Sequence, residues 1–361
     1  MEKVLYQLRT FMSKGYVACM AACAMLLMLM GCNEDMCNDR DKEAEMPEWV
    51  IIDTDIASST DDIIAMGILY RATDMGKVQL KAIMISREGE DNARFADIMN
   101  TYYQHPEIPI GVARDGVKNP EVFIDYWKMV HPEIYTDEPR FPTTLTDSEI
   151  AQLPDAVKLY RKILSQAPDS SVKIVSIGFA TNLARLLLSK ADEYSPLDGV
   201  ELVSKKVKAL YQQGGSFGDN PLPDYNFLMD KENARKLISK WPSAIYYSPM
   251  ESGQEYSYLK EELLADLMVA NRKDSPLYHI YEHHEVNDDQ RMWDALTALQ
   301  LMAPEIFRCE GPFDSSLDAD MILRLTPNPA GKHFVQVPPA SDQEKEEVMQ
   351  HLRDWIKAHR K

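Results

Sequence analysis

From Glu48 onward, short runs of apolar, often β-branched residues alternate with longer segments whose apolar residues recur every three or four positions. The short runs predict buried strands, and the longer segments predict amphipathic helices. The predicted strands are 50–53, 80–86, 110–113, 172–177, 207–211 and 244–248, and the predicted helices are 61–73, 92–103, 148–166, 182–191, 231–240, 261–270 and 291–302. This alternation is typical of an α/β fold, a mostly parallel sheet flanked by helices.

Four carboxylates surround one predicted strand-to-helix turn, at Asp53, Asp55, Asp61 and Asp62. Asp53 and Asp55 are two residues apart where the first strand ends, so their side chains point to the same side. Asp61 and Asp62 open the following helix, where an Asp-Asp pair taken alone is more often an N-cap than a metal site. Four acids together repel one another unless a cation neutralises them. The stretch therefore predicts a site for a hard metal ion.

Three further segments carry polar residues where predicted elements begin or end. Segment 176–182 follows the fourth strand, segment 213–226 follows the fifth, and Trp293 and Asp294 lie in the last apolar helix. A charged residue is unusual in such a helix. Ligands bind beyond the carboxyl ends of the strands in open α/β sheets, so these segments are candidates for the same site as the acids.

Length, charge and cysteine content narrow the function classes. The chain has 361 residues, enough for one large α/β domain or two ordinary ones, and a formal net charge of −18. Phosphate binding needs clustered Lys and Arg, so this balance argues against nucleic acid and anionic membrane surfaces as partners. A nucleoside, a neutral sugar or a divalent cation remains compatible. Past residue 47 the only cysteine is Cys309, which excludes a disulfide scaffold and a cysteine-based zinc site.

The N-terminus predicts export and a lipid anchor. Basic residues precede an uncharged run, 16–30, whose fifteen residues are fewer than the roughly 20 that span a bilayer. Residues 1–31 therefore predict a signal peptide. The run ends in a Leu-Met-Gly-Cys sequence that resembles a bacterial lipobox, with Cys32 as the lipidated residue. Residues 32–47 predict an acidic flexible tether, so the expected location is the cell envelope, at the outer membrane and facing outward or into the periplasm.

The ordered set of motifs resembles the inosine–uridine preferring nucleoside hydrolase family over roughly residues 48 to 325. The family's opening motif, an Asp-x-Asp followed by Asp-Asp and a helix, is matched with a connecting loop two residues longer than in the commonest form. The other matches are Gly178, Thr181 and Asn182 for its Thr-Gly-x-x-Thr-Asn segment, Asp224 and Asn226 for its acidic-x-Asn pair, and Trp293 and Asp294 for its late His-Asp pair.

This resemblance implies a Rossmann-like open sheet over residues 48–340 and a Ca²⁺ cofactor. Separately, the capping-box sequence at 341–344 predicts a solvated C-terminal helix in residues 341–361. The implied calcium ligands are the carboxylates of Asp55, Asp62 and Asp294 and the main-chain carbonyl of Ile177. Oxygen ligands of this kind suit Ca²⁺, which takes six to eight of them.

The implied reaction is hydrolysis of the N-glycosidic bond of a nucleoside or related riboside, which gives free base and ribose. Asp55 would take the proton of the attacking water, and the transition state would resemble an oxocarbenium ion. Asp53 would support the site. The implied substrate-binding residues are Asp61, Asn220, Asp224, Asn226 and Trp293, with Asp294 also orienting sugar hydroxyls.

Two positions depart from the family pattern. Trp293 stands where the family has a His that can assist departure of the base; Trp has no transferable proton at neutral pH, but its face can stack on a ring. Arg87 opens a segment, 87–90, that stands where the family has an Asn after the second strand. Segment 271–290 is the expected lid, and its His283 and His284 are the nearest candidates for a replacement acid.

Two other functions remain open from the sequence. A magnesium phosphohydrolase of the haloacid dehalogenase type would use Asp53 and Asp55, but it gives no role to Asp62 or Asp294. A surface lipoprotein that binds a nucleoside or sugar without turnover would use the same residues as the hydrolase. A calcium site of the EF-hand type is excluded, because Ile64 stands where that loop needs its final Glu. A homo-oligomer is compatible with each function.

Overall fold

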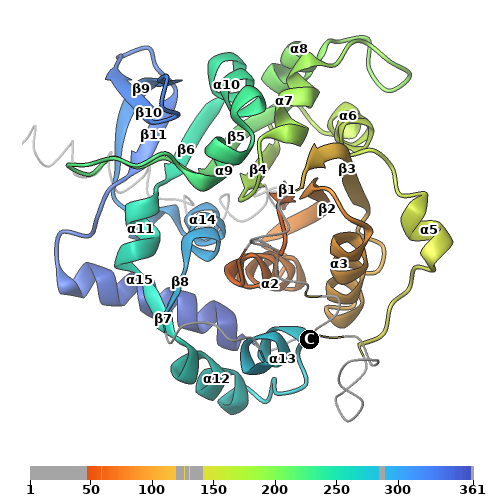
Figure 1. Cartoon of the computed structure of the whole chain (residues 1–361), viewed down its shortest axis with the longest axis vertical. Coiled ribbons are helices and arrows are strands. Elements are labelled where there is room, and N and C mark those ends of the chain that lie inside the picture. The colour runs from red at the N-terminus through yellow and green to blue at the C-terminus, as the bar shows by residue number, and fades with distance from the viewer. Residues whose placement is uncertain are drawn as a thin grey trace, which may run out of the picture. The chain divides into compact units, whose positions relative to one another are not determined.

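Parallel strands form the centre of the fold (Figure 1). The computed structural model describes residues 47–57, 59–118, 126, 130, 141–283 and 289–358. Within them, one sheet has nine strands, in the spatial order β10 (Leu323–Pro327), β9 (Cys309–Leu317), β11 (His333–Gln336), β6 (Ala244–Ser248), β5 (Val207–Gln213), β4 (Val172–Ser176), β1 (Glu48–Thr54), β2 (Val78–Arg87) and β3 (Ile110–Val117). A separate antiparallel pair joins β7 (Ser257–Leu259) and β8 (Asp289–Arg291). The predicted mostly parallel α/β fold is confirmed.

Helices lie on both faces of this sheet (Figure 1). The described helices are α2 (Asp61–Asp74), α3 (Glu90–Tyr102), α5 (Asp147–Ala151), α6 (Ala156–Gln166), α7 (Thr181–Leu188), α8 (Gly199–Lys206), α9 (Tyr225–Met229), α10 (Lys231–Lys240), α11 (Met250–Glu255), α12 (Lys260–Val269), α13 (Pro276–His283), α14 (Trp293–Met302), the 3₁₀ turn η2 (Pro304–Ile306) and α15 (Asp342–Lys357). No helix within these described residues is both long enough and apolar enough to cross a bilayer.

The structure corrects three expectations. The single helix predicted over 148–166 is two helices, because Pro154 interrupts it and Asp155 caps α6 by accepting a hydrogen bond from the Val157 N–H at 2.9 Å. The antiparallel strands β9 to β11 were not predicted, since β9 is polar and largely exposed. The C-terminal helix is not fully solvated, because α15 buries Val348, Met349, Leu352 and Ile356.

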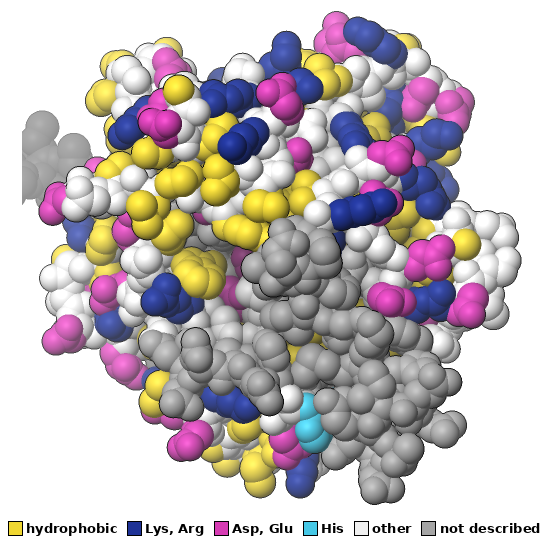
Figure 2. Space-filling view, viewed as in Figure 1, with side chains coloured by type: hydrophobic (Ala, Val, Ile, Leu, Met, Phe, Trp, Pro, Cys, Tyr) yellow, Lys and Arg dark blue, Asp and Glu magenta, His cyan; other side chains and the backbone are white. Residues whose placement is uncertain are grey.

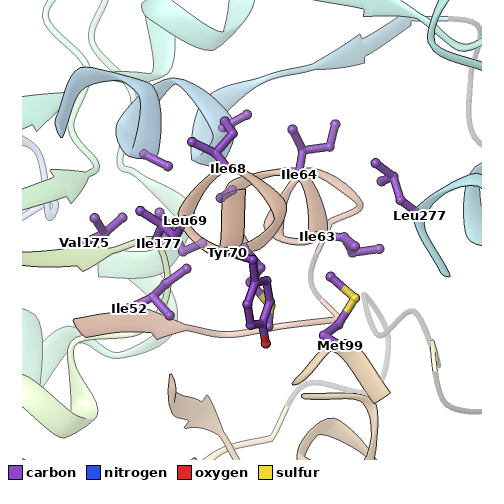
Figure 3. Close-up of a cluster of buried hydrophobic side chains, with 14 of the residues drawn as sticks. Ile52, Ile63, Ile64, Ile68, Leu69, Tyr70, Met99, Val175, Ile177 and Leu277 are labelled. Carbon is purple, nitrogen blue, oxygen red and sulfur yellow. The ribbon is translucent and has the colours of Figure 1, made fainter. Parts of the chain in front are cut away.

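Helix α2 is buried on nearly all sides, which decides where its N-terminus lies. Every residue from Asp61 to Ala72 is buried. Figure 3 shows apolar side chains pointing from this helix in several directions, toward the sheet and neighbouring helices. A helix that is apolar all round belongs in a protein interior. It therefore carries Asp61 and Asp62, its first two residues, into the interior as well.

The register of β1 and β4 brings two predicted motifs together. The strands are parallel, Asp53 pairs with Ser176, and the Ile177 N–H donates to the Asp53 carbonyl at 2.8 Å. Gly178 follows, and a Cβ at this position would lie 2.2 Å from the backbone nitrogen of Asp55. Only glycine allows the two strand ends to approach this closely.

The predicted signal peptide, 1–31, the lipidated Cys32 and nearly all of the predicted tether lie outside the described residues, as does His284.

We expect Gly178→Ala to lower the free energy of unfolding by about 3 kcal/mol, because the added methyl meets backbone atoms that cannot move aside. Urea unfolding followed by circular dichroism measures the change. Gly218→Ala is the matched control, since its Cβ would meet the Glu251 side chain at an ordinary 3.4 Å. Equal losses in the two variants would show that the close approach at Gly178 does not constrain the fold.

Candidate active site

Five acids meet where β1 ends and where α2 and α14 begin. Asp53, Asp55, Asp61 and Asp62 are at most 1% exposed, and Asp294, the second residue of α14, is 5% exposed. We call these five residues the acid cluster. Buried carboxylates lose hydration, and their mutual repulsion is stronger than it would be in water.

Two members of the acid cluster lie at the N-terminus of α2 with different partners. Asp61 accepts hydrogen bonds from the Ser59 hydroxyl and from the Asp294 N–H, the latter at 2.8 Å, so it joins α2 to α14. Asp62 accepts from the Thr54 hydroxyl through Oδ1. Its other oxygen, Oδ2, is buried and has no hydrogen-bond partner among the described residues. An unsatisfied buried carboxylate oxygen is costly, and a cation would satisfy it.

Burial and mutual repulsion raise the pKa values in this cluster. Burial raises the pKa of Asp61 to about 6, and the negative charge of Asp55 adds to the shift. The pKa of Asp62 is raised well above its usual value by burial and then by Asp55. The pKa of Asp294 is likewise raised, first by burial and then by the charges of Asp61 and Asp62. Without a cation, the cluster therefore favours partial protonation.

A buried guanidinium faces Asp55. Arg87, the last residue of β2, is 2% exposed; its Nε donates to the Asp55 carbonyl at 3.1 Å, and its Nη2 lies 3.6 Å from Oδ2 of the Asp55 carboxylate. The same guanidinium lies over the Phe179 ring, 5.3 Å from its centroid. Arg87 thus supplies positive charge inside the cluster, at the position where the sequence departs from the family pattern.

The Asp53 carboxylate is held by hydrogen bonds from two neighbouring helices. Its carboxylate accepts hydrogen bonds from the Tyr160 hydroxyl at 2.8 Å and from the Asn182 amide at 3.2 Å. Burial raises the pKa of Asp53 to about 8 despite these two bonds, which lower it. Asp53 therefore links β1 to α6 and α7.

A cavity of about 370 Å³ opens beside the acid cluster. Its lining comes from the ends of β4, β5 and β8, from the loop after β1, and from the starts of α9, α11 and α14. The lining residues are Asp55, Ser59, Ile177, Gln213, Asp224, Tyr225, Asn226, Met250, Arg291, Trp293 and Asp294. In the same view as Figure 1, Figure 2 shows hydrophobic side chains gathered around α9, with charged side chains of both signs farther out.

One side of the cavity is a polar network built on β5 and α9. Asp224 caps α9 by accepting from the N–H groups of Asn226 at 3.0 Å and Phe227 at 3.4 Å. The Asn226 amide donates to Gln213 Oε1 at 2.9 Å and to the Ile177 carbonyl at 3.4 Å. Burial raises the pKa of Asp224 to about 6. Carboxylate and amide groups held in this way can bind the hydroxyls of a sugar.

Another side of the cavity is aromatic. The Trp293 indole N–H donates to the Met250 carbonyl at 3.0 Å, and the ring lies against Gly253, where a Cβ would come within 1.8 Å of it. The Arg291 guanidinium is 5.6 Å from the centre of the Trp293 ring. Among the described residues that line the cavity, Arg291 is the only cation. This side can accept a flat ring by stacking.

The structure places the predicted site residues in three groups. Six line the cavity: Asp55, Ile177, Asp224, Asn226, Trp293 and Asp294. Asp61 and Asp62 lie buried behind them, whereas Asn220 is exposed and is not a lining residue. The lining residues that sequence reasoning did not assign are Ser59, Gln213, Tyr225, Met250 and Arg291. Gln213 had a signal, because it opens segment 213–226, which follows the predicted fifth strand.

The expected lid differs from the structure in its described part. Residues 276–281 form the buried first part of α13 and are not an exposed flap. Burial raises the pKa of Tyr281 well above its usual value, and the charges of Asp61 and Asp294 add to the shift, so α13 packs close to the acid cluster. His283 ends this helix and is not among the lining residues of the cavity.

Among the described residues, no three carboxylates of the acid cluster bring their oxygens within 4.8 Å of one another. The group of possible metal ligands that meets this spacing is His279, Glu282 and His283. The acids are instead turned toward separate donors, such as Thr54, Ser59 and Arg87. The donor set itself, buried and all-oxygen, fits a hard cation.

Comparison with known proteins gives the family. Residues 50–350 match the family described as inosine-uridine preferring nucleoside hydrolase. No curated protein matches the sequence closely enough to count as a relative.

Solved structures share the fold at low sequence identity. An inosine-guanosine nucleoside hydrolase has a TM-score of 0.62 at 18% identity, with 86% of this chain and 99% of that chain covered. The inosine-uridine preferring nucleoside hydrolase from Bacillus anthracis has a TM-score of 0.60 at 16% identity, with 85% and 99% covered. The type III effector XopQ, solved with adenosine diphosphate ribose, has a TM-score of 0.64 at 13% identity, with 87% and 94% covered.

The family match spans most of the chain, and the structures with the same fold include nucleoside hydrolases. The chain therefore belongs to the inosine-uridine preferring nucleoside hydrolase family, and both family and fold support hydrolysis of an N-glycosidic bond as its reaction.

Proposed function

We propose that this chain is a calcium-dependent hydrolase that splits the N-glycosidic bond of a nucleoside or related riboside into free base and ribose. The observation that carries the proposal is the acid cluster, whose Asp62 Oδ2 is buried without a partner among the described residues beside a cavity of about 370 Å³. The polar network and the aromatic side of that cavity match the two halves of a nucleoside.

The residues that would hold the ion are Asp55, Asp62 and Asp294, with the Ile177 carbonyl as a main-chain ligand. Three observations support this set: it is buried, it offers only oxygen, and the pKa values of Asp62 and Asp294 are raised by burial and then by neighbouring carboxylates. When bound, Ca²⁺ supplies positive charge that stabilises the acids in their ionised forms and lowers the pKa of a coordinated water.

Asp55 is the proposed base. Its carboxylate lines the cavity, and Nη2 of Arg87, 3.6 Å from Oδ2 of Asp55, orients it. An ionised carboxylate at this place can take the proton of a water that attacks the anomeric carbon. Asp294 contacts sugar hydroxyls from the same side, and Asp61 holds the Asp294 backbone in place through its 2.8 Å hydrogen bond. Asp224 and Asn226 bind the far side of the sugar.

The leaving base would stack on Trp293. Because the indole cannot protonate the base, another group must stabilise the negative charge that develops on it. Arg291 is the one cation among the described lining residues, and its positive charge can stabilise the negative charge on the leaving base. The base-departure step of this chain therefore differs from one that uses a histidine acid.

The alternatives have less support. A phosphohydrolase would need to bind a charged phosphate, but the described lining has three acids and one cation, which disfavours a phosphate dianion. A protein that binds a nucleoside or sugar without turnover would use the same residues, and the cleavage assay below separates it from the hydrolase. We also propose that lipid on Cys32 anchors the enzyme to a bacterial cell envelope, where it would meet nucleosides outside the cytoplasm.

The first test is cleavage of a nucleoside panel by the purified full-length chain with Ca²⁺, measured as free base and reducing sugar. We expect release from at least one riboside, and we expect Asp294→Ala to abolish both calcium binding and release. Asp219→Asn, which changes an exposed acid that does not line the cavity, is the matched control and should keep full activity. A chain that binds Ca²⁺ but cleaves no riboside contradicts the hydrolase proposal, and phosphatase activity that survives Asp294→Ala favours the phosphohydrolase.

Trp293→Ala should raise KM for the cleaved riboside at least tenfold, because the stacking face for the base is lost. Trp293→Phe keeps an aromatic face and should raise KM less than Trp293→Ala does. Initial rates over a range of substrate concentrations separate KM from kcat. If Trp293→Ala leaves KM unchanged, the base does not bind on this side of the cavity.

The metal-free chain should lose stability as pH rises from about 4 to about 8. The pKa values of Asp53, Asp61 and Asp224 are raised on folding, to about 8, about 6 and about 6, so the folded state binds more protons than the unfolded state in this window. Melting temperatures in the presence of a chelator measure the loss. Added Ca²⁺ should raise the melting temperature more at pH 8 than at pH 5; a chelated chain that is more stable at pH 8 contradicts the expectation.

A further inference from the structure

A second group of possible metal ligands lies on α13, apart from the acid cluster. His279, Glu282 and His283 each offer one ligand atom, and the three atoms lie within 4.8 Å of one another. The imidazole rings of His279 and His283 are 4.4 Å apart between centroids. These residues occupy positions i, i+3 and i+4 of one helix, so they share one face.

The chemistry of this group differs from that of the acid cluster. Imidazole nitrogens suit Zn²⁺, Cu²⁺ and Ni²⁺, whereas Ca²⁺ takes oxygen ligands. Two histidines four residues apart on one helical face are a known arrangement for zinc, and His-x-x-Glu-His is the order found in one class of zinc enzymes. The group also occupies the last turn of α13, and the C-terminal end of a helix favours a cation.

The surroundings of the group combine burial with access. His279 is 2% exposed and packs at 5.8 Å, between ring centroids, against Phe141, so its ring is held by packing. The side chains of His283 and Glu282 are 25% and 37% exposed, so an ion can reach them from solvent. Glu282 lies 3.6 Å from the His283 Nε2 and accepts a hydrogen bond from the Tyr278 hydroxyl at 3.3 Å. One ligand is thus fixed, and two can adjust around an ion.

We propose that α13 binds one divalent transition-metal ion, of the Zn²⁺ class, through His279, Glu282 and His283. None of the three lines the cavity beside the acid cluster, so this ion is separate from the proposed calcium. Tyr281 on the same helix is buried close to Asp61 and Asp294. A metal on this turn of α13 therefore fixes the helix that packs against the acid cluster.

The test is a titration of the chelator-treated full-length chain with Zn²⁺, carried out with Ca²⁺ at saturation so that the acid cluster does not take up zinc. Calorimetry should give one Zn²⁺ per chain, and Co²⁺ in its place should give a visible absorption band. His283→Gln and Glu282→Gln should each weaken zinc binding, His283→Gln by at least tenfold.

His351→Gln, which changes a histidine of α15 outside the group, is the matched control and should bind zinc as the original chain does. His279 is buried, so His279→Gln is used only if circular dichroism shows that it folds; the two more exposed positions carry the test without it. Absence of zinc binding by the original chain overturns the proposal, and so does zinc binding that both His283→Gln and Glu282→Gln retain unchanged.

Discussion

The burial of several carboxylates at one place is the constraint on which the rest of this structure depends. Asp55, Asp61, Asp62 and Asp294 come from the end of β1 and from the first residues of two helices, and none is more than 5% exposed. Like charges in a protein interior can be kept only with protons or with a cation. The raised pKa values of Asp61, Asp62 and Asp294 reflect the cost of keeping them charged without a cation. The same cost is the reason why we propose a calcium ion at this place in the fold.

The fold meets this constraint with two apolar helices and one glycine. Helices α2 and α14 are buried against each other, so their first residues bring Asp61 and Asp62 against Asp294 across 233 residues of sequence. Gly178 lets the end of β4 approach Asp55, which places the Ile177 carbonyl at the same cavity. Apolar packing thus positions the charged groups of the acid cluster beside the cavity.

Local sequence signals predicted much of the fold and of the acid cluster. The β-branched run before Asp53 and the apolar period after Asp62 predicted β1 and α2, because both signals lie within one element. Pairing of Asp61 with Asp294 depends on long-range packing, so only the order of the motifs indicated it. The strands β9 to β11 were missed because β9 is polar and largely exposed, and because β11 joins the sheet by pairing with the distant β6. Met250 and Arg291 line the cavity through the path of the chain in space, which has no local signal.

The acid cluster should exchange protons for a cation, and proton release on calcium binding measures that exchange directly. Calorimetric titration of the chelator-treated chain with Ca²⁺ at pH 6, in two buffers that differ in ionisation enthalpy, gives the number of protons released. The raised pKa values of Asp61, Asp62 and Asp294 predict one ion bound with release of about one proton or more. Calcium binding without any proton release, or no calcium binding, would show that the acid cluster does not exchange protons for calcium.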